Sequence, residues 1–267
     1  MDDRQQPESL KDILSRTWTP LSANGVSGNT TDQDTSAKSP PCPECEGMGW
    51  LSMPDGEFGS KALRCGCRAQ EDAEFRQMTL RTWANVTGPL AAKTFASLLP
   101  RPDVPEWARM LDGAREYAAG RCPEKWLALM GARGAGKTHL ALAVANERIA
   151  AGQVVRFDTA PNLLSELRSR FDAPRGEGKS ADDLVRDYSQ VSLLVLDDLG
   201  AEKQTDWAAE KLFMVLDYRY LHELETVITS NGLPTHMPPR LADRLMDKRM
   251  VLLCGGSIPS YRSGRTW

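Results

Sequence analysis

Residues 131–138, GARGAGKT, decide the fold of this chain. They fit the pattern G-x-x-x-x-G-K-[ST] without deviation, and they lie between an apolar run at 125–130 and an amphipathic run at 138–151, which predict a strand and a helix. The glycines let the backbone curl until successive N–H groups point at phosphate oxygens, and the dipole of the following helix adds positive potential. The stretch therefore predicts a P-loop in an α/β fold rather than a glycine-rich turn that arose by chance.

The residues of the P-loop have separate expected tasks at an ATP site. Lys137 is expected to reach the β- and γ-phosphates, and Thr138 to bind Mg²⁺ through its hydroxyl. His139 follows inside the helix and is assigned to the nucleotide site by position only, with no catalytic role. The glycines assigned to the phosphates are Gly131, Gly134 and Gly136.

An acidic pair is expected to complete the phosphate site from a neighbouring strand. The run at 191–196 (VSLLVL) predicts a buried parallel strand, and Asp197 and Asp198 follow it. Asp197 is expected to hold Mg²⁺, and Asp198 to orient or deprotonate the attacking water. The alternative is an ordinary capping Asp at a strand end. Many ATPases of this type have Glu at the second position, so the shorter Asp198 suggests modest turnover.

Other strands and helices extend this pattern along the chain. From about residue 107 onward, helix and strand signals alternate, which predicts a parallel sheet flanked by helices. The expected strand at 226–229 leads into Asn231, a candidate sensor of the γ-phosphate. The alternative for Asn231 is a turn formed with Gly232.

The overall composition excludes some classes of protein. The net charge is −3 over 267 residues and the isoelectric point is near 5.7, which excludes a globally basic protein. No apolar run reaches the about 18 to 20 residues that a membrane helix needs. The N-terminal residues are polar and acidic, unlike a signal peptide, so the expected location is the cytoplasm.

Four of the six cysteines form two close pairs. Cys42 and Cys45 have C-x-x-C spacing, Cys65 and Cys67 have C-x-C spacing, and 19 residues separate the pairs. Four thiolates in this arrangement are typical of a structural zinc site with tetrahedral geometry. The alternatives are free thiols or redox chemistry. The sequence therefore predicts a small zinc module that depends on its metal to fold.

Two arginines after the last expected strand raise the question of assembly. Arg240 and Arg244 lie four residues apart on an expected helix, and therefore on one face. An arginine supplied by a neighbouring subunit can stabilise the transition state of phosphoryl transfer. The spacing alone favours this role and a solvated helical face equally.

Several stretches together resemble the DnaC/DnaI-type helicase loaders and their IstB-type transposition relatives. They are 193–220 (LLVLDDLGAEKQTDWAAEKLFMVLDYRY), 226–231 (TVITSN) and the terminal Ser-Tyr-Arg at 260–262. The resemblance covers roughly residues 92–262. It implies an AAA+ ATPase that forms helical assemblies, binds single-stranded DNA, and loads or remodels a DnaB-type replicative helicase. Only 36 residues follow Asn231, which agrees with a family that lacks most of the AAA+ lid domain.

The resemblance also implies roles for individual residues. Asn231 matches sensor 1, Arg244 the arginine finger, Arg240 a companion arginine and Arg262 the sensor-2 arginine. The family contacts single-stranded DNA through the region before the Asp197 strand, where basic groups lie near an aromatic ring. A solvated helix face is the alternative for this region. Its residues are Arg168, Arg170, Phe171, Arg175, Lys179 and Arg186.

The sequence thus predicts four parts: an N-terminal helix and flexible linker at 1–40, the zinc module at 41–70, a connector at 71–100 and the AAA+ ATPase domain at 101–267. The leading hypothesis is a helicase loader whose zinc module contacts the helicase or initiator. An IstB-type transposition ATPase is the nearest alternative. A P-loop kinase for small molecules and a nucleotide-controlled interaction protein are the two others.

Overall fold

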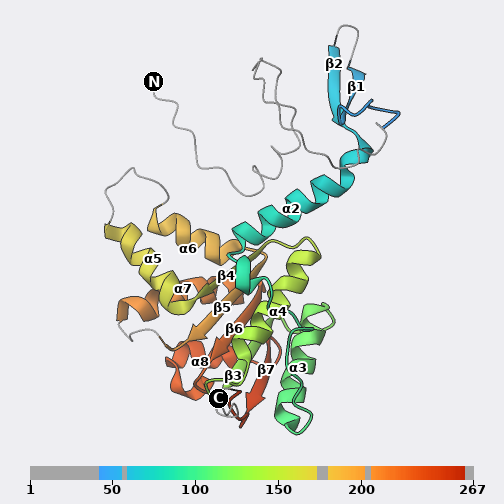
Figure 1. Ribbon diagram of the computed structural model, residues 1–267. Helices are drawn as coiled ribbons and strands as arrows, with labels where there is room; N and C mark the ends of the chain where they lie inside the picture. The colour runs from blue at the N-terminus through green and yellow to red at the C-terminus, as the bar shows by residue number, and fades with distance from the viewer. Residues whose placement is uncertain (1–41, 56–58, 173–179, 202–205, 262–267) are drawn as a thin grey trace. The chain divides into compact units, whose positions relative to one another are not determined.

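The structure is a computed structural model that describes residues 42–55, 59–172, 180–201 and 206–261. The chain divides into two compact units, Met1–Arg76 and Gln77–Trp267 (Figure 1). The helix and linker expected within 1–40 lie outside the described residues, as do Arg175, Lys179 and Arg262.

The first unit is built on a β-hairpin. Strand β1 (Trp50–Asp55) pairs antiparallel with β2 (Gly59–Arg64), and the short 3-10 helix η1 (Gly66–Arg68) follows. Helix α2 (Ala69–Trp83) begins in this unit and ends in the second. Only three residues in the described part of 42–76 are buried, and they are Cys45, Gly49 and Cys65. This unit therefore has no hydrophobic core of its own among the described residues.

The second unit contains a five-stranded sheet in which every neighbouring pair is parallel. The strand order is β4-β5-β6-β3-β7, so the P-loop strand β3 lies between β6 and β7. Parallel strands need crossover connections, and helices supply most of them. The strands are β3 (Trp126–Gly131), β4 (Val155–Thr159), β5 (Leu193–Leu199), β6 (Glu225–Ser230) and β7 (Val251–Gly256).

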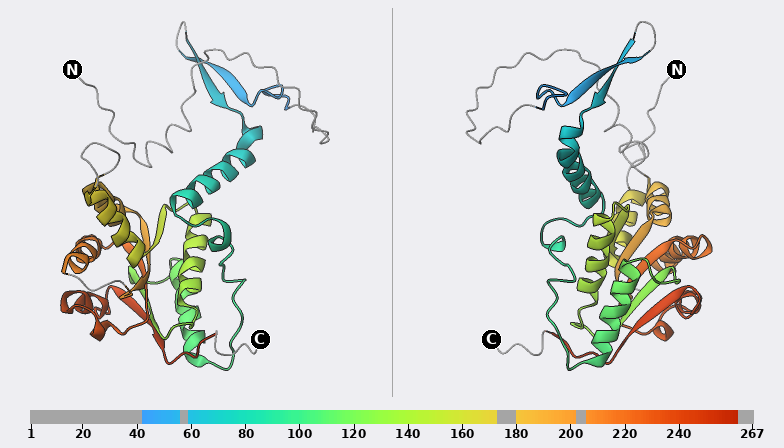
Figure 2. Two further views of the ribbon diagram at one scale, coloured as in Figure 1. Left: turned by 60° about the vertical axis from the view of Figure 1, so that its left-hand side comes forward. Right: turned by 90° about the vertical axis from the view of Figure 1, so that its right-hand side faces the viewer.

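Helices cover both faces of this sheet (Figure 2). Helices α3 and α4 pack on one face, and α5, α6, α7 and α8 on the other. Helix α8 is short, and no lid domain follows it in the described part of the chain. The bounds are α3 (Pro105–Ala118), α4 (Lys137–Ala150), α5 (Ala160–Asp172), α6 (Ala181–Gln190), α7 (Asp206–Leu221) and α8 (Pro239–Leu245).

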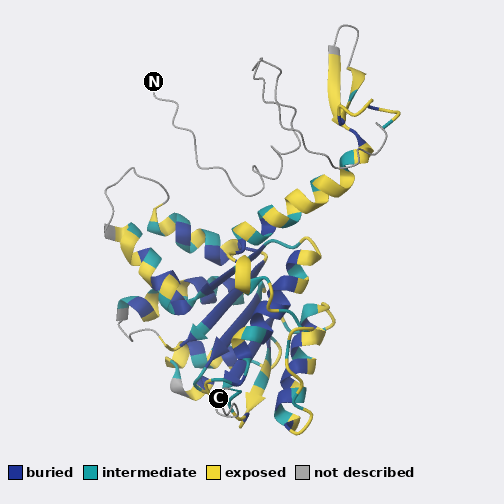
Figure 3. Cartoon of the chain, viewed as in Figure 1, coloured by how far each residue is buried: buried dark blue, intermediate teal, exposed yellow. Residues whose placement is uncertain are grey.

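Alternation along the strands creates two hydrophobic cores, one on each side of the sheet. Leu127 and Leu129 of β3 point to the α3–α4 side, whereas Trp126, Ala128 and Met130 point to the other side. Figure 3 shows the sheet as the buried centre of this unit. Burial of one such large side chain stabilises the fold by about 1.5–3 kcal/mol. The prediction of a parallel sheet flanked by helices with little or no lid is confirmed.

Part of the expected connector packs into the second unit. Helix α2 ends at Trp83 within this connector, and an irregular segment with the 3-10 turn η2 (Gly88–Leu90) follows. Leu80, Ala84 and Val86 are buried in the core on the α3–α4 side, so the residues after α2 contribute to that core. Among the described residues, no helix has both the length and the apolar character required to cross a bilayer.

Candidate nucleotide site and cysteine cluster

The P-loop joins the end of β3 to the start of α4, as the sequence predicts. Gly134 has φ +81° and Gly136 has φ +94°, values that L-residues rarely adopt. A Cβ at Gly134 would lie 2.0 Å from Ser260 Oγ, and one at Gly136 would lie 3.1 Å from the Tyr261 ring. Both glycines are therefore required by backbone conformation and by the close approach of the C-terminal segment.

Lys137 is held inside the loop that precedes it. Its side chain is buried, and Nζ donates to Gly131 O at 2.8 Å, to Ala132 O at 2.9 Å and to Asn231 Oδ1 at 2.9 Å. Burial lowers the pKa of this ammonium group, and the carboxylates of Asp198 and Asp197 oppose that effect. The ammonium is therefore held by three oxygen atoms in and beside the P-loop.

Asp197 lies opposite Thr138 and is held by two hydroxyl groups. Thr138 Oγ1 donates to Asp197 Oδ2 at 3.1 Å, and Thr229 Oγ1 donates to Oδ1 at 2.6 Å. Burial raises the pKa of the Asp197 carboxyl, while these two hydrogen bonds lower it. The hydroxyl and carboxylate oxygens of Thr138 and Asp197 are hard ligands of the kind that Mg²⁺ binds, so this pair fits the expected metal site.

Asp198 lies at an irregularity between β5 and β6. The register shifts between Leu196 and Leu199, and Asp198 has φ +58°, a conformation that Asp tolerates better than most residues. Its N–H donates to Thr229 Oγ1 at 2.9 Å, and its Oδ1 accepts from Asn231 Nδ2 at 2.6 Å. Asn231 therefore bridges Asp198 and Lys137. The residues that the sequence assigns to the phosphates meet where β3, β5 and β6 end and α4 begins.

All the residues assigned to the phosphates except Gly131 line a pocket of about 1240 Å³. One wall of the pocket comes from residues 90–99, here called the pocket strap, and from Tyr261. Neither was assigned to the nucleotide site from the sequence, because the strap has no motif and only Arg262 was given a role in the Ser-Tyr-Arg stretch at 260–262. The other lining residues, outside the P-loop, the acidic pair, Thr229 and Asn231, are Leu90, Lys93, Ser97, Leu98, Leu99, His139, Leu142 and Tyr261.

Two polar side chains of α4 hold the pocket strap by its backbone. Asn146 Nδ2 donates to the carbonyl oxygens of Leu90 at 3.2 Å and Lys93 at 3.0 Å. His139 Nε2 lies 3.0 Å from Thr94 O and 3.0 Å from Ser97 Oγ. Because a carbonyl only accepts, Nε2 carries the proton in this arrangement. His139 lines the pocket, and its described hydrogen bonds are all to the strap.

Tyr261 connects the strap to the P-loop. Its N–H donates to Gly134 O at 2.8 Å, and its hydroxyl donates to Leu99 O at 2.9 Å. The guanidinium of Arg101 lies 4.4 Å from the centre of its ring, and Trp107 contacts the ring edge with a centroid separation of 6.4 Å. The pocket is therefore closed by one segment that precedes the strands of the five-stranded sheet in sequence and by one that follows them.

Arg240 and Arg244 lie on α8, away from the pocket lining of their own chain. Arg244 forms an ion pair with Asp217 of α7, and its guanidinium lies 4.9 Å from the centre of the Phe213 ring. Arg240 lies 5.6 Å from the same ring. The two arginines share one face of the helix, as their spacing predicts.

The described residues of the expected DNA-binding region are mostly engaged within the chain. Arg168 stacks over Trp207 at 5.0 Å, Arg170 pairs with Glu166 at 2.8 Å, and Phe171 is 69% exposed. Arg186 of α6 pairs with Asp183 at 3.3 Å. Trp207 is an aromatic neighbour of this group that the sequence reasoning missed.

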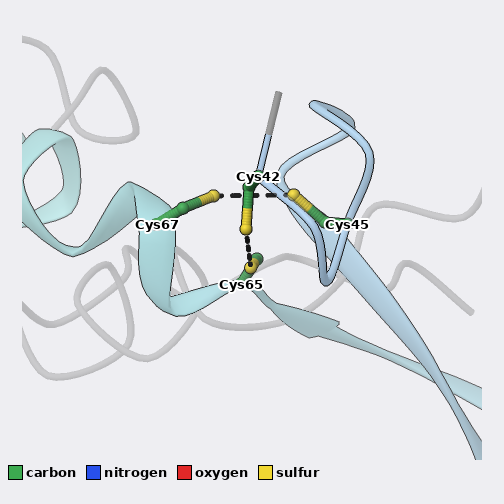
Figure 4. Close-up of side chains that lie close together, drawn as sticks. All are labelled: Cys42, Cys45, Cys65 and Cys67. Carbon is green, nitrogen blue, oxygen red and sulfur yellow. Dashed lines mark hydrogen bonds between the residues drawn. The ribbon is translucent and has the colours of Figure 1, made fainter. Parts of the chain in front are cut away.

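The four cysteines meet at the base of the hairpin (Figure 4). All four sulfur atoms lie within 4.8 Å of one another, with Cys42 Sγ 3.8 Å from Cys65 Sγ and Cys45 Sγ 3.5 Å from Cys67 Sγ. Zinc–sulfur bonds of about 2.3 Å in a tetrahedron place sulfur atoms about 3.8 Å apart. The N–H of Gly49 donates to Cys45 Sγ at 3.2 Å, as it would to a thiolate. The cluster therefore fits one tetrahedral ion.

Known proteins are similar to part of this chain. Residues 123–251 match the family described as IstB-like ATP binding protein. The replicative helicase loader DnaC of Escherichia coli (strain K12) is 30% identical over 139 residues, which are 50% of this chain and 54% of that protein. A putative ATP-binding protein in an insertion sequence of Mycobacterium tuberculosis is 30% identical over 149 residues, which are 52% of this chain and 57% of that protein. The chain thus spans about half the length of these relatives.

Solved structures share the fold. The crystal structure of the DnaC helicase loader superimposes with a TM-score of 0.52 at 24% identity, covering 63% of this chain and 99% of that chain. The replication initiator DnaA bound to AMPPCP and single-stranded DNA gives 0.51 at 21% identity, covering 62% and 50%. These matches indicate the AAA+ ATPase fold.

Proposed function

We propose, from the match of residues 123–251 to the family described as IstB-like ATP binding protein, that this AAA+ ATPase hydrolyses ATP to load a replicative helicase onto single-stranded DNA. The observation that carries the ATPase part is the hydrogen-bonded chain from Lys137 through Asn231 to Asp198. These hydrogen bonds bring an ammonium group, an amide and a carboxylate around one point of the pocket, which supports their proposed roles as cation, sensor and base in phosphoryl transfer to water.

Each residue of this hydrogen-bonded series has a proposed role in ATP hydrolysis. A water attacks the γ-phosphorus while the bond to the β–γ bridging oxygen breaks, and Asp198 takes the proton of that water. Lys137 and the P-loop N–H groups stabilise charge on the phosphate oxygens. Mg²⁺, held by Thr138 and Asp197, supplies further positive charge when bound. Without nucleotide, the Asn231 side chain binds both Lys137 and Asp198. A γ-phosphate that binds Lys137 replaces one of these partners, so Asn231 changes its hydrogen bonds when ATP is present.

Self-assembly is part of the proposal because Arg244 lies away from its own pocket. It acts as an arginine finger on the ATP of a neighbouring subunit, with Arg240 beside it on the same face of α8. A finger of this kind contributes a factor of about 10³–10⁵ in turnover. Arg262 serves as the sensor-2 arginine by the family resemblance.

The zinc module and the partners complete the proposal. Cys42, Cys45, Cys65 and Cys67 hold Zn²⁺, since their sulfur atoms fit a tetrahedral ion. The module contacts a DnaB-type helicase or an initiator. Single-stranded DNA binds the face of Arg168, Arg170 and Phe171, where an exposed aromatic ring lies among basic groups. The protein works in the cytoplasm.

The test is the ATPase rate against protein concentration, with and without single-stranded DNA, for wild type and Arg244→Ala. We expect a specific activity that rises with concentration and with DNA, and that collapses in the variant while ATP still binds. A rate independent of concentration and unaffected by the substitution would contradict the assembly and would favour a P-loop kinase or a passive nucleotide switch.

A second candidate function is target selection in transposition, because a relative at similar identity belongs to an insertion sequence. The two functions share the ATPase and differ in the partner. Purified DnaB-type helicase and a circular single strand distinguish them: a loader transfers the helicase to the circle in an ATP-dependent way. Failure to load, with ATP-dependent binding to double-stranded DNA, would favour the transposition role.

A further inference from the structure

Three side chains on one face of α7 surround the guanidinium of Arg244. They are Phe213, Asp217 and Tyr220, whose spacing of four and three residues puts them in a row along the helix. Asp217 makes the ion pair, and the two rings lie 4.9 and 5.3 Å from the guanidinium carbon. We call these three residues the arginine cradle.

The cradle is anchored to the core of its own subunit. The hydroxyl of Tyr220 donates to Asp247 Oδ2 at 2.6 Å, and its ring meets the edge of Trp126 with a centroid separation of 6.1 Å. Trp126 is fully buried and begins β3, the strand that ends at the P-loop. The position of the guanidinium is therefore tied to the rigid part of the fold.

The hydrogen bonds within the subunit do not use up the donors of Arg244. A guanidinium has five N–H groups. One on Nη1 reaches Arg240 O at 3.0 Å, one on Nη2 reaches Asp217, and Nε is buried without a hydrogen-bond partner in the described part of the chain. Among the described residues, one N–H on each Nη nitrogen has no partner, and a paired contact with phosphate oxygens uses two such N–H groups.

We propose that Asp217 is a positioning residue that holds the Arg244 guanidinium in the orientation in which it meets the nucleotide of the neighbouring subunit. The inference rests on the proposed role of Arg244 in trans. Catalysis of phosphoryl transfer depends on positioning and on prearranged charge, so a guanidinium that is fixed in advance loses less entropy when subunits meet. Asp217 itself contacts no substrate.

The experiment is a double-mutant cycle between Asp217→Asn and Arg244→Ala, with steady-state and single-turnover ATPase rates at a protein concentration that saturates assembly. We expect Asp217→Asn to lower kcat about 10- to 100-fold, the loss that a displaced catalytic group causes, with KM for ATP unchanged. In the Arg244→Ala background the same substitution should have no further effect.

Two further variants separate positioning from folding. Asp217→Glu keeps the charge and should restore part of kcat, whereas Asp243→Asn removes an exposed acid beside Arg244 in sequence and should leave kcat unchanged. Thermal unfolding of each variant, followed by circular dichroism, should match wild type. If Asp217→Asn does not fold, the cycle is run with Asp217→Glu, whose smaller loss of kcat should likewise vanish in the Arg244→Ala background.

Several results would overturn the inference. One is an unchanged kcat in Asp217→Asn. Another is a raised kcat in that variant, which would make the ion pair inhibitory. A third is a loss of kcat from Asp217→Asn that is equally large in the Arg244→Ala background. If Arg244→Ala alone leaves kcat unchanged, the proposed finger fails and the inference fails with it. If Arg244→Ala abolishes turnover and Asp217→Asn does not, only the inference about Asp217 fails.

Discussion

The nucleotide site and the cysteine cluster obtain their order from different sources. Around the nucleotide site, strands buried on both faces fix the backbone, and side chains such as Asp197 and Asn231 have hydrogen-bond partners without any ligand. In the hairpin unit, the buried residues are two cysteines and one glycine among those described. The difference teaches that packing alone prepares the nucleotide site, whereas the described hairpin has little packing to hold the cysteine cluster in place. Four predictions test this contrast, from the largest expected effect to the smallest.

Removal of the metal should abolish the folded hairpin and spare the ATPase fold. Cys45→Ser breaks a four-sulfur site, and structural zinc contributes about 10–16 kcal/mol of apparent binding energy to such modules. The variant should lose bound zinc, measured by a colorimetric metal assay, while the main thermal transition stays in place. Cys122→Ser, outside the cluster, should keep one zinc per chain. Wild-type protein purified without any metal would contradict the zinc site.

Truncation of a core side chain should destabilise the ATPase fold and leave the hairpin unit intact. Leu127 is fully buried on β3, so Leu127→Ala should lower the free energy of unfolding of the second unit by about 2–5 kcal/mol. Zinc content should not change. Leu63→Ala in the hairpin is the matched control, since Leu63 is 41% exposed and its truncation should cost under about 0.5 kcal/mol. Chemical denaturation measures both, and equal losses would erase the contrast.

A methyl group in the P-loop should be costly, and the same change in the cysteine module should not. Gly134→Ala combines φ +81° with a clash against Ser260, and the strain should cost about 1–3 kcal/mol and weaken ATP binding. Gly66→Ala meets no atom within 4 Å. Calorimetric titration with ATP and thermal unfolding compare the two variants. ATP affinity equal to wild type in Gly134→Ala would show that the loop has room to move.

Neutralising Asp197 should stabilise the protein without nucleotide while abolishing hydrolysis. Burial raises the pKa of this carboxyl, so the folded chain holds its proton more tightly than the unfolded chain does. Its contribution to stability is therefore present at low pH and is lost as pH rises through the raised pKa. At neutral pH, Asp197→Asn should raise the free energy of unfolding by about 0.5–2 kcal/mol.

The control for Asp197→Asn is Asp243→Asn, on an exposed acid. Thermal unfolding from pH 4 to pH 8 should show the gain of Asp197→Asn growing with pH, while the control follows wild type. A gain that shrinks as pH rises would mean that the hydrogen bonds from Thr138 and Thr229 outweigh the cost of burial.

The sequence predicts what has a chemical signature and misses what is held by backbone contacts. The spacing of Lys137, Asp197 and Asn231 placed them at adjacent strand ends, where the structure also has them. The pocket strap escaped prediction because its hydrogen bonds use main-chain carbonyls, which every residue has. Strand β7 was not identified, because a short apolar run such as 251–254 does not distinguish strand from helix. Helix α6 was not identified either, although Ser180 and Asp183 form a capping box at its start.

The position of the pocket strap before the family match determines where the protein can be truncated. A fragment cut at the limits of the family match, 123–251, would lose α3 with Trp107, the whole strap and Tyr261. It would expose the core beneath α3 and leave the P-loop without the tyrosine that fastens it. An expression fragment that preserves the nucleotide pocket has to begin by Gln77 and extend at least to Tyr261.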